Sequence, residues 1–226
     1  MKKINIWEFG SRLNVKVNQN FINRINNEIK EQFKTKKKAY DKLILKKPIP
    51  FSTFKSRIKR GYVNFIDVEI LVELCKLLFM PLNELQGNII AYKTRRGRNY
   101  IEKPKLPVKI TPIFDMLIAH HIGDGCVINP GRNRKPYFSY KQYDKQYRTL
   151  YLKKIESVFG KLNYRSNYLY NNKTKQVYFP VACSELTFKS YNLGINSFKS
   201  EIARLPKDIL KKDSEYQLAF LIGTQV

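Results

Sequence analysis

The stretch TPIFDMLIAHHIGDG, residues 111–125, decides the fold of the second half of this chain. It begins with Thr111 and Pro112, and threonine is a good N-cap while proline suits the first position of a helix. The helix that follows is mostly apolar and ends in a Gly-Asp-Gly triplet. Glycines at that point allow two backbones to approach closely. The pattern therefore predicts an apolar helix whose C-terminal end presents a carboxylate at the mouth of an interface.

A related stretch, LAFLIGTQV, occupies residues 218–226. Ser214 and Gln217 form a capping box just before it, which predicts the start of another helix. When the two stretches are aligned, Gln225 stands at the position of Asp124, and a valine replaces the final glycine. The chain therefore contains one apolar helix that ends in an acid and the beginning of a second helix that does not.

The region between the two stretches alternates between strand and helix patterns. Short runs bounded by turn residues predict four strands. Two segments with helical periodicity predict helices between and after these strands. The expected strands are residues 126–129, 137–143, 164–170 and 176–181, and the expected helices are residues 147–159 and 184–193.

The nonapeptide LIAHHIGDG, residues 117–125, resembles the motif of the LAGLIDADG homing endonucleases, in the variant that ends Gly-Asp-Gly. The order helix, two strands, helix, two strands, helix resembles the half-domain of that family. The stretch RLPKDIL at residues 204–210 is similar to the one that precedes the second motif in two-motif members. The resemblance covers residues 111–226, as one half-domain and the opening helix of another. It implies an antiparallel, saddle-shaped sheet that binds double-stranded DNA.

The resemblance also implies an active site. Asp124 falls at the position of the acid that binds the catalytic divalent metal in this family, with Gly125 beside it. Lys199 lies near the place of a basic active-site residue, and Lys173 and Lys175 are alternatives for that role. Each motif helix of the family supplies one carboxylate to Mg²⁺, which needs hard oxygen ligands and lowers the pKa of the attacking water. Because Gln225 is neutral, one chain does not supply both acids.

Three functions are compatible with a single acid. In the first, two chains pair through the helix at residues 113–123, each supplies Asp124, and the homodimer cleaves a nearly palindromic site in double-stranded DNA with Mg²⁺. In the second, the protein is a catalytically inactive relative of the endonucleases that binds DNA as a regulator. In the third, the same basic saddle binds structured RNA, as a maturase-like protein does.

Residues 21–88 show helical periodicity, and the domain expected at residues 1–89 resembles the helix-turn-helix domains of phage-repressor type. The expected fold is an all-α bundle in which residues 40–45 form the first helix of the motif and residues 52–60 form the recognition helix. Phe51, Phe54 and Ile58 would pack inward, leaving the polar side chains to reach bases and phosphates in the major groove. The alternative is a solvated basic face on a small helical bundle. The expected DNA contacts are Ser52, Thr53, Lys55, Arg57 and Arg60.

Residues 90–110 are basic and contain Pro104 and Pro107, which predicts a linker between the two parts. The linker either follows the phosphate backbone or is a solvated connection. The fold class is then α+β, with domains at residues 1–89 and 111–226. On the saddle, basic side chains are expected to contact phosphates or to remain solvated rather than to read bases. These side chains are Arg132, Arg134, Lys135, Lys141, Arg165 and Lys175.

The chain is strongly basic, with 43 Lys and Arg against 18 Asp and Glu and a formal net charge of +25 over 226 residues. Such an excess favours a polyanionic partner. A membrane role is disfavoured, because no apolar run reaches the roughly 18 residues of a spanning helix. The three cysteines form no Cys-x-x-Cys pair and the N-terminus has no signal-peptide pattern, so a reduced cytoplasmic protein is expected.

Overall fold

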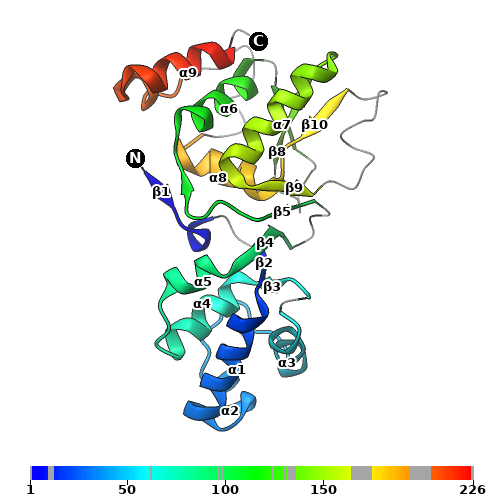
Figure 1. Ribbon diagram of the computed structural model, residues 1–226, viewed down its shortest axis with the longest axis vertical. Helices are drawn as coiled ribbons and strands as arrows, with labels where there is room; N and C mark the ends of the chain where they lie inside the picture. The colour runs from blue at the N-terminus through cyan, green and yellow to red at the C-terminus, as the bar shows by residue number, and fades with distance from the viewer. Residues whose placement is uncertain are drawn as a thin grey trace.

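The computed structural model describes residues 2–9, 13–61, 63–95, 97, 99–123, 125–129, 131, 136–163, 175–193 and 205–224. These residues form a mixed α+β fold in which every paired strand is antiparallel, which confirms the predicted class. The N-terminal helices lie at one end of the long axis, and α6, α7 and α9 lie at the other (Figure 1). The largest sheet of the described residues lies between the two ends (Figure 1).

The N-terminal part packs helices around a core to which α1 and α4 contribute much of the apolar surface. Phe21, Ile22 and Ile25 of α1 are at most 3% exposed, and the Asp67 side chain caps α4 by accepting a hydrogen bond from the Glu69 N–H. The elements are β1 (Lys3–Ile4), η1 (Ile6–Glu8), β2 (Leu13–Val17), α1 (Gln19–Phe33), α2 (Lys36–Asp41), α3 (Phe51–Lys59), β3 (Ile66–Asp67), α4 (Val68–Leu77) and α5 (Leu82–Gly87).

The prediction that residues 1–89 are all helical is wrong, because β2 and β3 pair with each other. Leu13, Val15 and Val17 recur at every second position of β2 and are all buried. A period of two is typical of a strand, whereas a helix repeats its apolar residues every three or four positions. The N-terminal part is therefore a helical bundle that rests on the edge of a sheet.

The first helix of the expected helix-turn-helix motif is also displaced. It was expected at residues 40–45, but α2 ends at Asp41. Its start is set by Thr35, whose side chain accepts a hydrogen bond from the Lys38 N–H. Tyr40 then donates its hydroxyl proton to the Ile49 carbonyl, which bridges the segment between α2 and α3.

The expected linker at residues 90–110 instead contributes strands. They are β4 (Ile89–Thr94), β5 (Tyr100–Glu102) and β6 (Val108–Lys109). Tyr92 and Ile101 pair across β4 and β5 and are at most 1% exposed, so this segment forms part of the core. We call the sheet of order β3-β2-β4-β5-β9 the central sheet, in which β9 (Lys161–Asn163) comes from the C-terminal part. Both halves of the chain therefore share one sheet.

The C-terminal part follows the predicted order where it is described. The predicted strands at residues 126–129, 137–143 and 176–181 and the two predicted helices are confirmed within a few residues, whereas the strand expected at 164–170 lies outside the described residues. Strands β10, β8 and β7 form what we call the C-terminal sheet. The elements are α6 (Pro112–Gly123), β7 (Gly125–Ile128), β8 (Tyr137–Lys141), α7 (Lys145–Phe159), β10 (Gln176–Tyr178), α8 (Val181–Ser190), η3 (Ile209–Lys211) and α9 (Ser214–Thr224).

Helices α6 and α9 lie side by side and pack very closely (Figure 1). A Cβ added to Gly223 of α9 would lie 2.7 Å from both the Met116 carbonyl oxygen and the Ala119 Cβ of α6. A Cβ added to Gly123 of α6 would lie 3.6 Å from the Thr224 carbonyl oxygen. The first of these distances is shorter than any ordinary van der Waals contact, so Gly223 is required at the crossing.

The two helices begin differently. The expected Thr111 N-cap of α6 is confirmed, since its Oγ1 accepts a hydrogen bond from the Phe114 N–H at 3.3 Å. The expected capping box of α9 is wrong, because Ser214 is already helical and Asp213 accepts the first backbone bonds through its carbonyl. The Gln217 side chain turns instead to the Leu210 and Lys212 carbonyls.

We expect Gly223→Val to lower the free energy of unfolding by about 1–3 kcal/mol or more, which is the usual cost of overpacking a filled core. The cause is a side chain forced against the α6 backbone. Urea unfolding followed by far-UV circular dichroism measures the loss. Gly87→Val is the matched control, because Gly87 also lies in a helix and a Cβ there would have no neighbour within 4 Å. Equal stability of the two variants would contradict the close crossing.

Candidate functional site

The C-terminal ends of α6 and α9 meet. Gly123 and Thr224 are in contact there, and Asp124 and Gln225 are the next residues of the chain and lie outside the described residues. The two helices that the sequence relates to one another therefore pair within a single chain. Helix α9 covers one face of the 113–123 helix, which is the helix through which a homodimer was expected to form.

The opposite face of α9 is apolar and exposed. Leu218, Leu221 and Ile222 follow one another at helical spacing, and their exposed fractions are 58%, 57% and 43%. Helix α6 differs, because its other sides are buried against α7 and β8. The pair is thus covered by protein on the α6 side and open on the α9 side.

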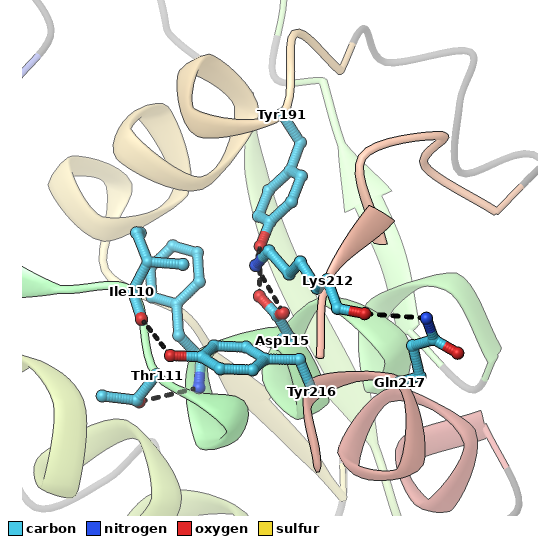
Figure 2. Close-up of polar contacts among 8 residues, drawn as sticks. Ile110, Thr111, Asp115, Tyr191, Lys212, Tyr216 and Gln217 are labelled. Carbon is cyan, nitrogen blue, oxygen red and sulfur yellow. Dashed lines mark hydrogen bonds and ion pairs between the residues drawn. The ribbon is translucent and has the colours of Figure 1, made fainter. Parts of the chain in front are cut away.

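A buried polar cluster holds α9 against the start of α6 (Figure 2). Asp115 is 0% exposed and its Oδ2 lies 2.6 Å from the Lys212 Nζ. Its Oδ1 accepts a hydrogen bond from the Tyr191 hydroxyl, which in turn accepts one from Lys212. The Lys212 Nζ also lies 4.8 Å from the ring centroids of both Tyr191 and Tyr216. One lysine therefore joins the first turn of α6, the end of α8 and the segment before α9.

Burial decides how this cluster titrates. It raises the pKa of Asp115, while Lys212 and Tyr191 act in the opposite direction by bonding to the carboxylate. Burial and the neighbouring carboxylate together raise the pKa of Tyr191. The sequence analysis did not identify this cluster. The available signal was an acid, Asp115, in the first turn of an otherwise apolar helix.

The two histidines of α6 point to different partners, as adjacent helical residues must. His121 stacks on Phe138 with ring centroids 3.9 Å apart, and its Nε2 lies 3.0 Å from the Tyr151 hydroxyl. The His120 Nε2 lies 2.8 Å from the Nζ of Lys154. Burial lowers the pKa of His120 to about 4 and lowers the pKa of His121 well below its ordinary value. Both rings are therefore neutral at pH 7 and pack α6 against α7 and β8.

Helix α3 has the two faces that a recognition helix requires. Phe54 and Ile58 are fully buried, which confirms that they pack inward. The polar side chains project from the opposite face of α3 and from its C-cap. Ser52, Lys55 and Arg60 are exposed, and Thr53 and Arg57 are half-buried.

A basic and aromatic cluster lies on the central sheet. The Nζ atoms of Lys16 on β2 and Lys93 on β4 lie 5.0 and 4.7 Å from the ring centroid of Phe65. The same Lys16 Nζ is 6.0 Å from the Tyr100 ring centroid, and the Tyr100 ring packs edge-on against Phe65. A cation over an aromatic face keeps its charge while its stem is buried. This cluster therefore presents positive charge on an apolar support.

A second cluster of the same kind lies beside the C-terminal sheet. Lys141 at the end of β8 and Lys175 before β10 both lie over the ring of Tyr143, at 5.3 and 4.7 Å from its centroid. Tyr143 is 66% exposed. Two lysines that were expected to contact DNA are thus brought together by one tyrosine.

A cavity lies between the central sheet and the C-terminal sheet. It has a volume of about 260 Å³ and is lined by Lys93 and Tyr100 from the central sheet and by Tyr137 and Tyr178 from the C-terminal sheet. We call the two clusters, together with the tyrosines of this cavity, the basic–aromatic track. It consists of Lys16, Phe65, Lys93, Tyr100, Tyr137, Tyr178, Lys141, Tyr143 and Lys175.

The track reaches toward α3. Arg57 of α3 and Arg95, next to β4, both lie near enough to Asp67 to lower its pKa, although burial is the larger effect and raises it. Most of the track was absent from the sequence-based site. The available signal was the recurrence of lysine among tyrosines in AYKT (91–94) and YFSYKQY (137–143).

The structure does not describe six of the other predicted site residues. These are Asp124, Lys199, Arg132, Arg134, Lys135 and Arg165. Gly125 is the first residue of β7, and a Cβ there would lie 2.6 Å from the His121 Cα.

Within the described part of the chain, no three His, Cys, Asp or Glu side chains form a group suited to a metal ion. None of the described helices has both the length and the apolarity needed to cross a membrane.

We expect Lys212→Met to lower the free energy of unfolding by about 3 kcal/mol at pH 7, because it leaves the buried Asp115 carboxylate unpaired. Lys211→Met is the matched control, since Lys211 is exposed and outside the cluster. Chemical denaturation of both variants at several pH values measures the difference.

The loss caused by Lys212→Met should shrink as the pH falls. The pKa of Asp115 is raised in the folded state, so the folded protein binds that proton more readily than the unfolded chain, and acidification favours folding through this group. The double variant Asp115→Asn/Lys212→Met should be more stable than Lys212→Met at pH 7 and should lack this pH dependence. A loss that does not change with pH would exclude Asp115 as its cause.

A scan of the chain against protein-family models finds no match. A search of curated proteins finds no similar protein. The resemblance to the LAGLIDADG proteins thus rests on residues 117–125 and on the order of the elements around them.

Proposed function

We propose that this protein binds double-stranded DNA along the basic–aromatic track and the polar face of α3. The observation that supports the proposal is that exposed and partly exposed lysines beside both sheets lie over aromatic rings, Lys16 and Lys93 over Phe65 and Lys141 and Lys175 over Tyr143. The net charge of +25 favours a polyanion, and spaced lysines on a firm support match the spaced phosphates of a duplex.

The two surfaces contribute differently. Lysines of the track bind phosphates, so they supply affinity and fix the position of the duplex without reading its sequence. Helix α3 carries hydroxyl, ammonium and guanidinium groups on one face and is short enough to enter a major groove. Sequence preference is therefore assigned to α3, and salt-dependent affinity to the track.

We expect the triple variant Lys16→Gln/Lys141→Gln/Lys175→Gln to weaken binding to every duplex and to reduce its dependence on salt. Each lost phosphate contact lowers the slope of log K against log salt by about 0.9, so the three together lower it by roughly 3. Fluorescence anisotropy at four salt concentrations measures both effects.

The control for this triple variant is Lys30→Gln/Lys109→Gln/Lys207→Gln. It removes the same charge from three exposed lysines outside the track. An equal change in slope for the two triple variants would mean that net charge alone, and not the track, binds DNA.

A second candidate activity is metal-dependent cleavage of the bound duplex. It is favoured by the α6–α9 crossing, because Gly123 and Thr224 meet just before Asp124 and Gln225. One carboxylate and one amide give a poor site for Mg²⁺ alone, but this ion usually takes one or two carboxylates and completes its shell with phosphates and water. Asp124 therefore fits a metal held jointly with DNA, where the ion would polarise a phosphate.

The homodimer is the less favoured way to supply a second acid. Two copies of Asp124 would have to meet across the 113–123 helix, and α9 already covers one face of that helix. The exposed apolar face of α9 offers another surface through which two copies could associate. A DNA-binding regulator without catalytic activity remains the alternative to cleavage.

We expect the wild type with Mg²⁺ to cut a randomised duplex library at a discrete site and Asp124→Asn to leave it intact, because an amide does not replace a metal-binding carboxylate. Sequencing of the ends detects the cuts. Binding of both proteins without cuts would identify a regulator. Displacement of the duplex by a lower concentration of structured RNA would favour the maturase-like alternative.

A further inference from the structure

The outer face of α9 carries a stripe of apolar side chains that is exposed. Leu218, Leu221 and Ile222 occupy positions i, i+3 and i+4 of the helix, and their exposed fractions are 58%, 57% and 43%. Residues with this spacing lie on one side of a helix. Another side of α9 is buried, because Gly223 packs against the backbone of α6. We call the three exposed side chains the α9 stripe.

The α9 stripe lies in the least charged part of the chain. Residues 216–226 form the longest stretch of the sequence without a Lys, Arg, Asp or Glu. The residues just before them, 205–215, contain three lysines and three acids, so their charges balance. In a chain with a net charge of +25, a surface that is both neutral and apolar is an exception.

The lack of charge indicates which partner fits the α9 stripe. An acidic protein would be attracted to the lysines of the track rather than to a neutral helix. A helix that lies on an anionic lipid surface carries lysine or arginine beside its apolar face, whereas α9 contains neither. A second copy of this chain fits, because a two-fold axis places the same apolar stripe on both sides of the contact. Two basic molecules also repel each other least where neither presents charge.

We propose that two copies of this chain associate through the α9 stripe, with Leu218, Leu221 and Ile222 of one copy packed against the same residues of the other. Helix α9 lies at one end of the long axis and α3 lies toward the other end (Figure 1), so a copy bound there leaves α3 uncovered. This pairing differs from a dimer through the 113–123 helix. It goes beyond the proposed DNA binding and does not depend on it.

The proposed contact has a distinctive dependence on salt. A few side chains from each copy make an interface at the small end of the range for specific complexes, so the dimer is weak. The net charge of +25 on each copy opposes the contact. Raising the ionic strength from about 0.15 M to about 1 M shortens the screening length from about 8 Å to about 3 Å, which weakens this repulsion. Self-association therefore strengthens with salt, whereas binding to DNA weakens.

Sedimentation velocity of the full chain without nucleic acid, from low micromolar to several hundred micromolar, measures the monomer–dimer equilibrium at both ionic strengths. We expect a dimer that dissociates on dilution and is tighter at the higher ionic strength. Leu221→Lys should weaken the dimer by more than about tenfold, because it places a lysine from each copy in the contact. A lysine near the C-terminal end of a helix suits the helix dipole, so this variant should fold, which circular dichroism checks.

Two further variants assign the effect to the α9 stripe. Ile44→Lys adds the same charge at an apolar residue of the N-terminal part that is 83% exposed, and it should dimerise like the wild type. Leu221→Met keeps an apolar side chain of similar volume and should also keep the dimer.

The outcomes separate this inference from the proposed function. A chain that stays monomeric at every concentration and at both ionic strengths overturns the inference, whatever its affinity for DNA. An equal loss for Leu221→Lys and Ile44→Lys overturns it too, because net charge and not the α9 stripe would then control association. So does a dimer that weakens as salt rises, since charged groups would hold it. Absence of salt-dependent DNA binding overturns the proposed function and leaves the dimer untouched.

Discussion

The crossing of α6 over α9 is the contact on which the C-terminal part depends. Both helices are apolar on most sides, so hydrophobic burial alone would allow them to slide or rotate against each other. Gly223 permits the close approach of the two helices, and the Asp115–Lys212 ion pair forms in only one alignment of α9 along α6. A buried ion pair adds little net stability compared with apolar residues, but its strict partners can specify a single arrangement. We infer that specificity is the main contribution of this pair.

The electrostatics of the molecule follow a second constraint. With 43 basic and 18 acidic side chains, most positive charges have no acid to pair with. Several lysines lie over aromatic rings instead, as Lys16 and Lys93 do over Phe65. Cation–π contacts orient the ammonium group without neutralising it. The fold therefore fixes the position of its surplus charge and keeps that charge available to an anion.

Local signals in the sequence predicted much of the C-terminal fold. Apolar periodicity and caps located α6, α7 and β8, and the spacing of Phe54 and Ile58 located the buried face of α3. The remainder depends on partners far apart in the chain. Asp115 and Lys212 are separated by 97 positions, and the cavity joins residues 92–101 to residues 137 and 178–182. Neither juxtaposition leaves a local pattern, and β3, β5 and β9 of the central sheet, with two or three residues each, are too short to show one.

The pairing of β5 with β9 has a consequence for how this chain can be divided. Residues 100–102 and 161–163 share backbone hydrogen bonds, so a cut at the expected boundary near residue 110 would leave two unpaired strand edges. Exposed edges invite pairing with other chains and aggregation. Recombination that joins other modules near residue 110, in evolution or in the laboratory, would therefore disrupt the central sheet. The N-terminal helices and the α6–α9 unit should therefore be engineered as one piece.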